Sequence, residues 1–129
     1  MVTREDVQSF IDRLDSGIVS SDEVETGLWV IHAEGVECVV HYNPPVLVMR
    51  VRVMELPAEP KRPELYRRLL EYNASDLLHG SYGLEGDHVV LTDTLQLEDL
   101  DFSEFQASYD SMMLALASHV GALAAYREG

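Results

Sequence analysis

The sequence has little cysteine, few basic residues and no long apolar run. Its 129 residues include a single cysteine, Cys38, which has no partner for an internal disulfide bond. No stretch approaches the roughly 20 apolar residues that span a bilayer, and the first residues lack the basic and apolar regions of a signal peptide. We therefore expect a cytoplasmic protein with no membrane partner.

Basic residues are outnumbered by acidic residues, 9 against 23, which gives a net charge of −14. Such a charge repels phosphate groups, so we expect no nucleic-acid partner. Six of the nine basic residues lie within residues 50–68. This block either neutralises acidic segments of its own chain or faces an acidic partner or a second subunit, and composition leaves both alternatives open.

The chain length and a hydrophobic content of 47% predict one domain with one core over residues 1–129. Thr3 and Asp6 form a pattern typical of a helix start, and apolar residues follow at helical spacing up to Leu14. We therefore expect a short first helix that ends near Gly17.

After the first helix the apolar pattern changes to a period of two, which is typical of strands. Residues 28–33 and 36–42 predict a hairpin around Glu34 and Gly35, and residues 46–56 predict a long third strand. Alternation along this strand predicts a core face of Leu47, Met49, Val51 and Val53, and an outer face of Val48, Arg50, Arg52 and Met54.

Helical spacing returns in residues 64–75, and a second hairpin is predicted over residues 80–97. Asp101 and Glu104 form a capping-box pattern at the start of a last helix of about 24 residues. The apolar stripe predicted for this helix is Phe105, Tyr109, Met112, Leu116, Val120 and Leu123. The predicted order is α-β-β-β-α-β-β-α, which is an α+β fold with an antiparallel sheet of five to six strands and helices on one face.

The glycine-rich stretch GSYGLEGDHVVL, residues 80–91, is a candidate phosphate site. A phosphate loop leads from a strand into a helix, whereas this stretch leads into a strand pattern, and Glu85 and Asp87 would repel phosphate. We therefore assign separate backbone roles to the glycines. Gly80 lies between a helix and a strand, where it can end the helix or allow a close backbone approach, Gly83 lies within a strand, and Gly86 lies in a hairpin turn.

Other reactive side chains also have structural explanations. Strand alternation places Cys38 on the opposite face from His41, so a zinc site with His32 is not expected. The carboxylates of residues 98–104 suit a helix start, and no GxSxG motif is present. We therefore expect no catalytic residues, no metal ligands, no cofactor and no enzymatic activity.

Residues 65–120 resemble the type III secretion chaperone-like superfamily, which includes the secretion chaperones and the YbjN-type domains. The resemblance rests on a helix ending in Leu-Leu-x-x-Asn, a strand, a Gly-Leu turn, a Val-Val-Leu strand and a long last helix. It implies a homodimer that binds an extended, unfolded segment of a partner protein and has no catalytic residues. The alternative that it implies is a YbjN-type regulatory or small-ligand-binding domain without an unfolded client.

The outer face of the predicted sheet is the surface where a protein or peptide partner is expected, because helices cover only the other face. The candidate partner-binding residues combine aliphatic and positive groups; they are Leu28, Val30, His32, Val39, His41, Val48, Arg50, Arg52 and Met54. The alternative is that this face is ordinary solvated sheet.

Overall fold

The computed structural model describes residues 1–14, 18–33 and 35–127. Its elements, in chain order, are α1 (Arg4–Arg13), β1 (Ile18–Glu25), β2 (Leu28–Ala33), β3 (Val36–Asn43), β4 (Val46–Glu55), the 3-10 turn η1 (Glu59–Lys61), α2 (Arg62–Ser75), β5 (Ser81–Glu85), β6 (His88–Gln96) and α3 (Phe102–Arg127). The predicted helix end near Gly17 and Glu34 of the predicted hairpin lie outside the described residues.

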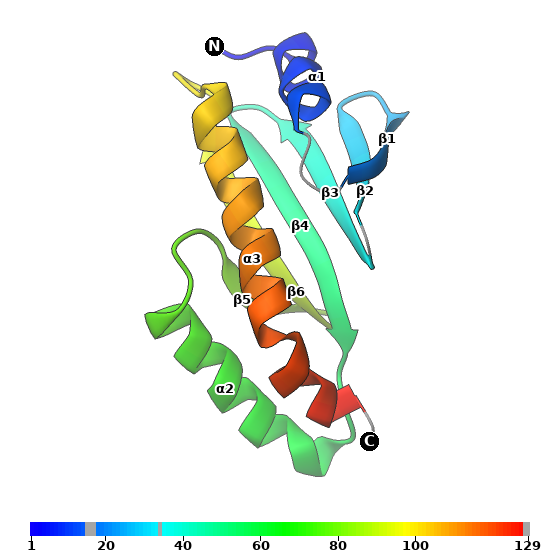
Figure 1. Ribbon diagram of the computed structural model, residues 1–129, viewed down its shortest axis with the longest axis vertical. Coiled ribbons are helices and arrows are strands. Elements are labelled where there is room, and N and C mark those ends of the chain that lie inside the picture. Colours follow the sequence, from blue (N-terminus) through cyan, green and yellow to red (C-terminus); the bar gives the residue numbers. More distant parts are fainter. Residues whose placement is uncertain (15–17, 34, 128–129) are drawn as a thin grey trace.

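The six strands form one antiparallel sheet in the order β1-β2-β3-β4-β6-β5. The three α-helices all lie on the same face of this sheet (Figure 1). Helix α1 lies near β2 and β3, α3 crosses β4 and β6, and α2 lies beside α3 and β5. The predicted α+β class, with helices on one face, is confirmed.

Strand β1 is the element that the predicted order omits. It pairs with β2, and Ser21 lies opposite Ile31 in the register. Its sequence, IVSSDEVE, has no clean apolar alternation, and most of its described residues are exposed. Because β1 is an edge strand, its hydrogen bonds to β2 define it and its own apolar pattern contributes little.

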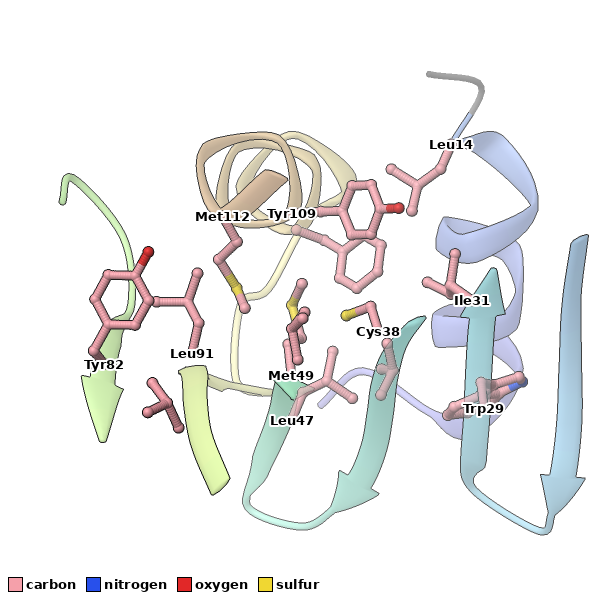
Figure 2. Packing of buried hydrophobic residues seen from close by; sticks show 14 of the residues in the cluster. Leu14, Trp29, Ile31, Cys38, Leu47, Met49, Tyr82, Leu91, Tyr109 and Met112 are labelled. Carbon is pink, nitrogen blue, oxygen red and sulfur yellow. The ribbon is translucent and has the colours of Figure 1, made fainter. Parts of the chain in front are cut away.

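The inner face of the sheet and the three helices enclose one core. Trp29 of β2 and Leu47 and Met49 of β4 have no exposed surface. Figure 2 shows α3 in end view above the sheet, with Met112 reaching toward the strands and Tyr109 reaching toward Leu14 beside α1. Each of these side chains removes a large apolar area from water, which makes this layer the main source of folding free energy.

Two helices begin with the predicted capping boxes. The Thr3 hydroxyl accepts a hydrogen bond from the Asp6 amide at 3.2 Å, and the Asp6 carboxylate accepts one from the Thr3 amide at 2.9 Å. At α3, the Asp101 carboxylate accepts from the Glu104 amide at 2.8 Å, and the reciprocal bond measures 3.3 Å. These bonds satisfy donors that lack a partner in a first helical turn. None of the described helices is both long and apolar enough to cross a membrane.

The glycines of residues 80–91 have separate roles, and the role of Gly80 is the predicted close backbone approach, because α2 already ends at Ser75. Gly80 leads into β5 with φ +82°, and a Cβ atom there would lie 3.1 Å from the Thr92 carbonyl oxygen. Gly86 has φ +58° in the turn between β5 and β6. Gly83 lies within β5, where a Cβ atom would meet no atom of the described chain within 4 Å.

We expect Gly80→Ala to lower the free energy of unfolding by about 1 to 3 kcal/mol, because alanine is strained at positive φ and its Cβ would crowd Thr92. Gly83→Ala is the matched control, and it should leave the stability equal or raise it by up to about 1 kcal/mol. Urea unfolding followed by circular dichroism measures both variants. Equal losses in the two variants would contradict the role assigned to Gly80.

Candidate partner-binding site

A shallow hollow of about 770 Å³ lies on the sheet face that the helices leave uncovered. We call it the outer hollow. It extends over β2, β3 and β4, and Glu37 and Glu85 lie on its rim. Six of the predicted partner-binding residues line it: Leu28, Val39, His41, Val48, Arg50 and Arg52.

Strand register explains how distant residues meet on this face. Val39 of β3 lies opposite Val30 of β2 on one side and opposite Arg50 of β4 on the other. His32 lies opposite Glu37 in a neighbouring row, with its Nδ1 atom 3.4 Å from the carboxylate. Val30 and His32 therefore share the outer face, beside the hollow.

The two arginines of β4 have different surroundings. Arg50 forms an ion pair with Glu85 of β5, and its Nε atom donates to the Thr92 hydroxyl at 3.3 Å. Arg52 is exposed and forms no ion pair with a carboxylate of the described residues. The two alternatives for the basic block thus apply to different residues: Arg50 neutralises an acidic group of its own chain, and Arg52 remains accessible to a partner.

Met54 was predicted on the outer face, and this placement is wrong. Its side chain is 7% exposed and belongs to the core. The pairing of β4 with β6 contains an irregularity, because Arg52 lies opposite Val90 while Met54 lies opposite the next residue, Val89. The extra residue, Val53, reverses the alternation of side chains along β4. The Met54 side chain therefore lies on the inner face of the sheet, which the helices cover.

A buried polar cluster links α2, β5 and α3, and the sequence patterns did not indicate it. His119 is 4% exposed; its Nδ1 atom lies 2.7 Å from the Tyr82 hydroxyl and its Nε2 atom 3.1 Å from the Asp76 carboxylate. The Tyr72 ring stacks on the imidazole at 3.6 Å. Burial raises the pKa of Tyr82, so this hydroxyl keeps its proton and donates to His119. His119 in turn donates from Nε2 to Asp76.

A signal for the burial of His119 was present in the sequence. The residue follows Leu116 by three positions and precedes Leu123 by four, which places it on the buried stripe of α3. Val120 was predicted in that stripe, but it is 50% exposed. Asp76 and Tyr82 could not have been found in this way, because they meet His119 only when three elements pack together. The arrangement holds these elements together through satisfied hydrogen bonds.

Cys38 is a core residue. It is 1% exposed, and burial raises its pKa to about 12. It belongs to the inner core, whereas His41 lines the outer hollow. Within the described ranges, no group of three histidine, cysteine or acidic side chains could hold a metal ion. Cys38 therefore has neither the thiolate character nor the exposure of a nucleophile.

A family model named CesT_Tir_1 matches residues 1–128. The chain belongs to this family. It is a family of type III secretion chaperones, so the resemblance stated from residues 65–120 is confirmed over nearly the whole length. No curated protein matches the chain.

Solved structures of the same fold include secretion chaperones and a regulator-like protein. One is the structure of the Yersinia pestis type III secretion chaperone SycH in complex with a fragment of YscM2. Its matched chain shares 20% sequence identity with this chain at a TM-score of 0.63, and the match covers 90% of this chain and 98% of that chain. The ExsC–ExsE complex is 13% identical, with a TM-score of 0.58 and coverage of 92% and 94%. YbjN of E. coli, a putative transcription regulator, is 14% identical, with a TM-score of 0.64 and coverage of 95% and 96%. At these identities the likeness shows a shared fold.

We expect Cys38 to resist labelling by Ellman's reagent at pH 8 in the folded protein, because the reactive thiolate is suppressed by a raised pKa and the sulfur is enclosed. The same cysteine should react within minutes in 6 M guanidinium chloride, where an ordinary thiol pKa of about 8.5 returns. Absorbance at 412 nm measures both rates. Rapid labelling of the folded protein would show that Cys38 is accessible.

Proposed function

We propose that this chain is a non-enzymatic, chaperone-like domain that binds an extended segment of a partner protein as a homodimer in the cytoplasm. The outer hollow is the observation that carries this proposal, because it offers aliphatic side chains and an accessible arginine on an uncovered sheet face. Membership of a secretion chaperone family supports it. The structures of SycH with YscM2 and of ExsC with ExsE are complexes with protein partners, which also supports it.

An extended segment suits this surface for geometric reasons. Side chains of an extended chain alternate, so every second residue of the segment can enter the hollow while the others face solvent. Leu28, Val39 and Val48 supply apolar contacts in the hollow, and Arg52 supplies a positive charge at its border. The carboxylate of Glu37 disfavours an acidic group beside it, whereas the carboxylate of Glu85 is neutralised by Arg50.

We expect Val48→Asp to weaken partner binding by at least about tenfold, because it places a charge among the apolar contacts of the outer hollow. Thr94→Asp is the matched control, since Thr94 lies directly opposite Val48 and is exposed outside the hollow. The partner is captured from a lysate of the native cell, its bound segment is mapped by limited proteolysis, and calorimetry with that segment gives the affinities.

Two outcomes of this experiment contradict the proposal. In one, the wild-type protein captures no protein under conditions where it is folded. In the other, the segment binds Val48→Asp and the wild-type protein equally well, which would move the binding surface away from the outer hollow. Circular dichroism of both variants checks that a lost affinity does not reflect unfolding.

The exposed face of α2 is the surface that we propose for the homodimer. Leu70 is 66% exposed there and lies beside Tyr66 in a wide, largely apolar depression of about 800 Å³. A large exposed aliphatic side chain in an apolar depression favours association with a similar surface. A two-fold axis at this face would leave the outer hollows of both subunits open.

We expect Leu70→Glu to convert a dimer into a monomer at micromolar concentration, because it adds one carboxylate from each subunit to a two-fold interface that already contains Glu64 and Glu71. Leu78→Glu is the control, since Leu78 is 88% exposed but lies outside this depression. Sedimentation equilibrium measures the molar mass. A wild-type protein that is monomeric at this concentration would refute the dimer, and a dimeric Leu70→Glu variant would refute the interface.

The second candidate is a regulatory or small-ligand-binding domain of the YbjN type. The similarity to YbjN over 95% of the chain supports it, and a hollow of about 770 Å³ is within the size range of small-molecule sites. A metabolite that raises the melting temperature, together with no capture of any protein segment, would favour this candidate over the first.

A further inference from the structure

A second groove, of about 470 Å³, lies on the helix side of the sheet between α3 and the ends of β2, β3 and β4. We call it the helix-side groove. Its strand wall includes Val36 and Val53, and its helix wall includes Met113, Leu116 and Val120. These walls are apolar, so water in the groove is poorly hydrogen-bonded and easily displaced.

The helices leave this groove open because of where each one packs. Helix α1 is anchored near the start of β2, where the Trp29 indole donates to the Gln8 side chain at 2.7 Å. The groove lies at the other end of β2, beside Ala33. Val120 remains half exposed although it points along the groove wall. The uncovered apolar surface is therefore a consequence of the fold.

Positive charge lies at one end of the groove. Arg52 and Arg127 both line it, in a chain that has only nine basic residues. The Arg127 guanidinium donates to the Val53 carbonyl at 3.2 Å, so it is held next to the strand residue that follows Arg52. Neither arginine forms an ion pair with an acidic side chain of the described residues. An acidic group on an occupant of the groove would therefore find two cations at this end.

The helix-side groove and the outer hollow share three lining residues. Both are lined by Gly35, Val36 and Arg52, which lie at the tip of the β2–β3 hairpin and on the adjacent part of β4. The two surfaces therefore approach each other beside Arg52.

We infer that the helix-side groove binds a short apolar anchor of a partner protein that continues into acidic residues beside Arg52 and Arg127. The inference rests on the proposed function for the nature of the partner. The groove wall from Met113 to Val120 is about 10 Å long, and two apolar side chains two positions apart in an extended chain are separated by about 7 Å. The groove therefore accepts two such side chains, and the arginines fix their direction.

Three peptides test the inference. The first is acetyl-Gly-Leu-Ser-Leu-Ser-Glu-Glu-Gly-amide, the second has lysine in place of both glutamates, and the third has serine in place of both leucines. Proton–nitrogen NMR spectra of the full chain report which backbone amides shift on titration. The first peptide should shift the amides of Val36, Met113 and Val120 and bind at least about tenfold more tightly than either of the others.

Variants of the protein test the same contacts from the other side. Val120→Asp and Arg52→Glu should each weaken binding of the acidic peptide by about tenfold, and both positions are exposed enough to tolerate the change in the folded state. Leu114→Asp is the control on the same helix, because Leu114 is 69% exposed and does not line the groove. It should leave the affinity unchanged.

The outcomes separate this inference from the proposed function. Equal affinity for the acidic and the lysine peptide, shifts confined to the outer hollow, or no binding to the folded protein would each overturn the helix-side groove as an acidic-anchor site. Val48→Asp should leave binding of the acidic peptide unchanged. Suppose that Val48→Asp abolishes capture of a natural partner and that the acidic peptide fails to bind the wild-type protein. The proposed function then stands, and the inference about the helix-side groove is wrong.

Discussion

The packing of α3 against β4 is the contact on which the arrangement of the whole molecule depends. Strand β4 is central, with β3 on one side and β6 on the other, and Met49 at its middle has no exposed surface. The Ser108 hydroxyl of α3 reaches both the Met49 sulfur, at 3.8 Å, and the Asp93 carboxylate of β6. Because α3 occupies the inner face along this line, the helices leave the opposite face of the same strands uncovered.

The irregularity between Arg52 and Met54 decides which side chains line the two surfaces. A regular strand would have placed Met54 on the outer face and Val53 in the core. The extra residue instead buries Met54 and brings Val53 to the wall of the helix-side groove. Arg52 then lies at the border between the outer hollow and that groove, so one bulge supplies the side chain that both surfaces share.

Local signals allowed much of the fold to be predicted from the sequence. The capping boxes at Thr3 and Asp101, and the turn at Gly86, each depend on a few neighbouring residues, and all three are confirmed. The omission of β1 and the misplacement of Met54 have another origin. Strand β1 is defined by its hydrogen bonds to the neighbouring strand β2, and the placement of Met54 by the pairing of β4 with the distant strand β6. Side-chain periodicity reports neither.

The candidate site, like the fold, was predictable where it depends on the pattern within one strand. Alternation in β2, β3 and β4 placed six residues of the outer hollow correctly, because neighbouring strands in register repeat one pattern. The ion pair of Arg50 with Glu85 joins residues 35 positions apart, and the helix-side groove exists only between packed elements. Neither feature could be predicted, because no single segment of the sequence carries a pattern that indicates it.

The acidic edge of the sheet has a consequence for self-association. Strand β1 ends the sheet, so one row of its backbone donors and acceptors faces away from β2, and such an edge commonly recruits the edge of another molecule. Its side chains include Asp22, Glu23 and Glu25. Two copies meeting along β1 would bring these carboxylates together, and their repulsion opposes the growth of sheets into filaments. The charge of this edge thereby protects the protein from polymerising with itself.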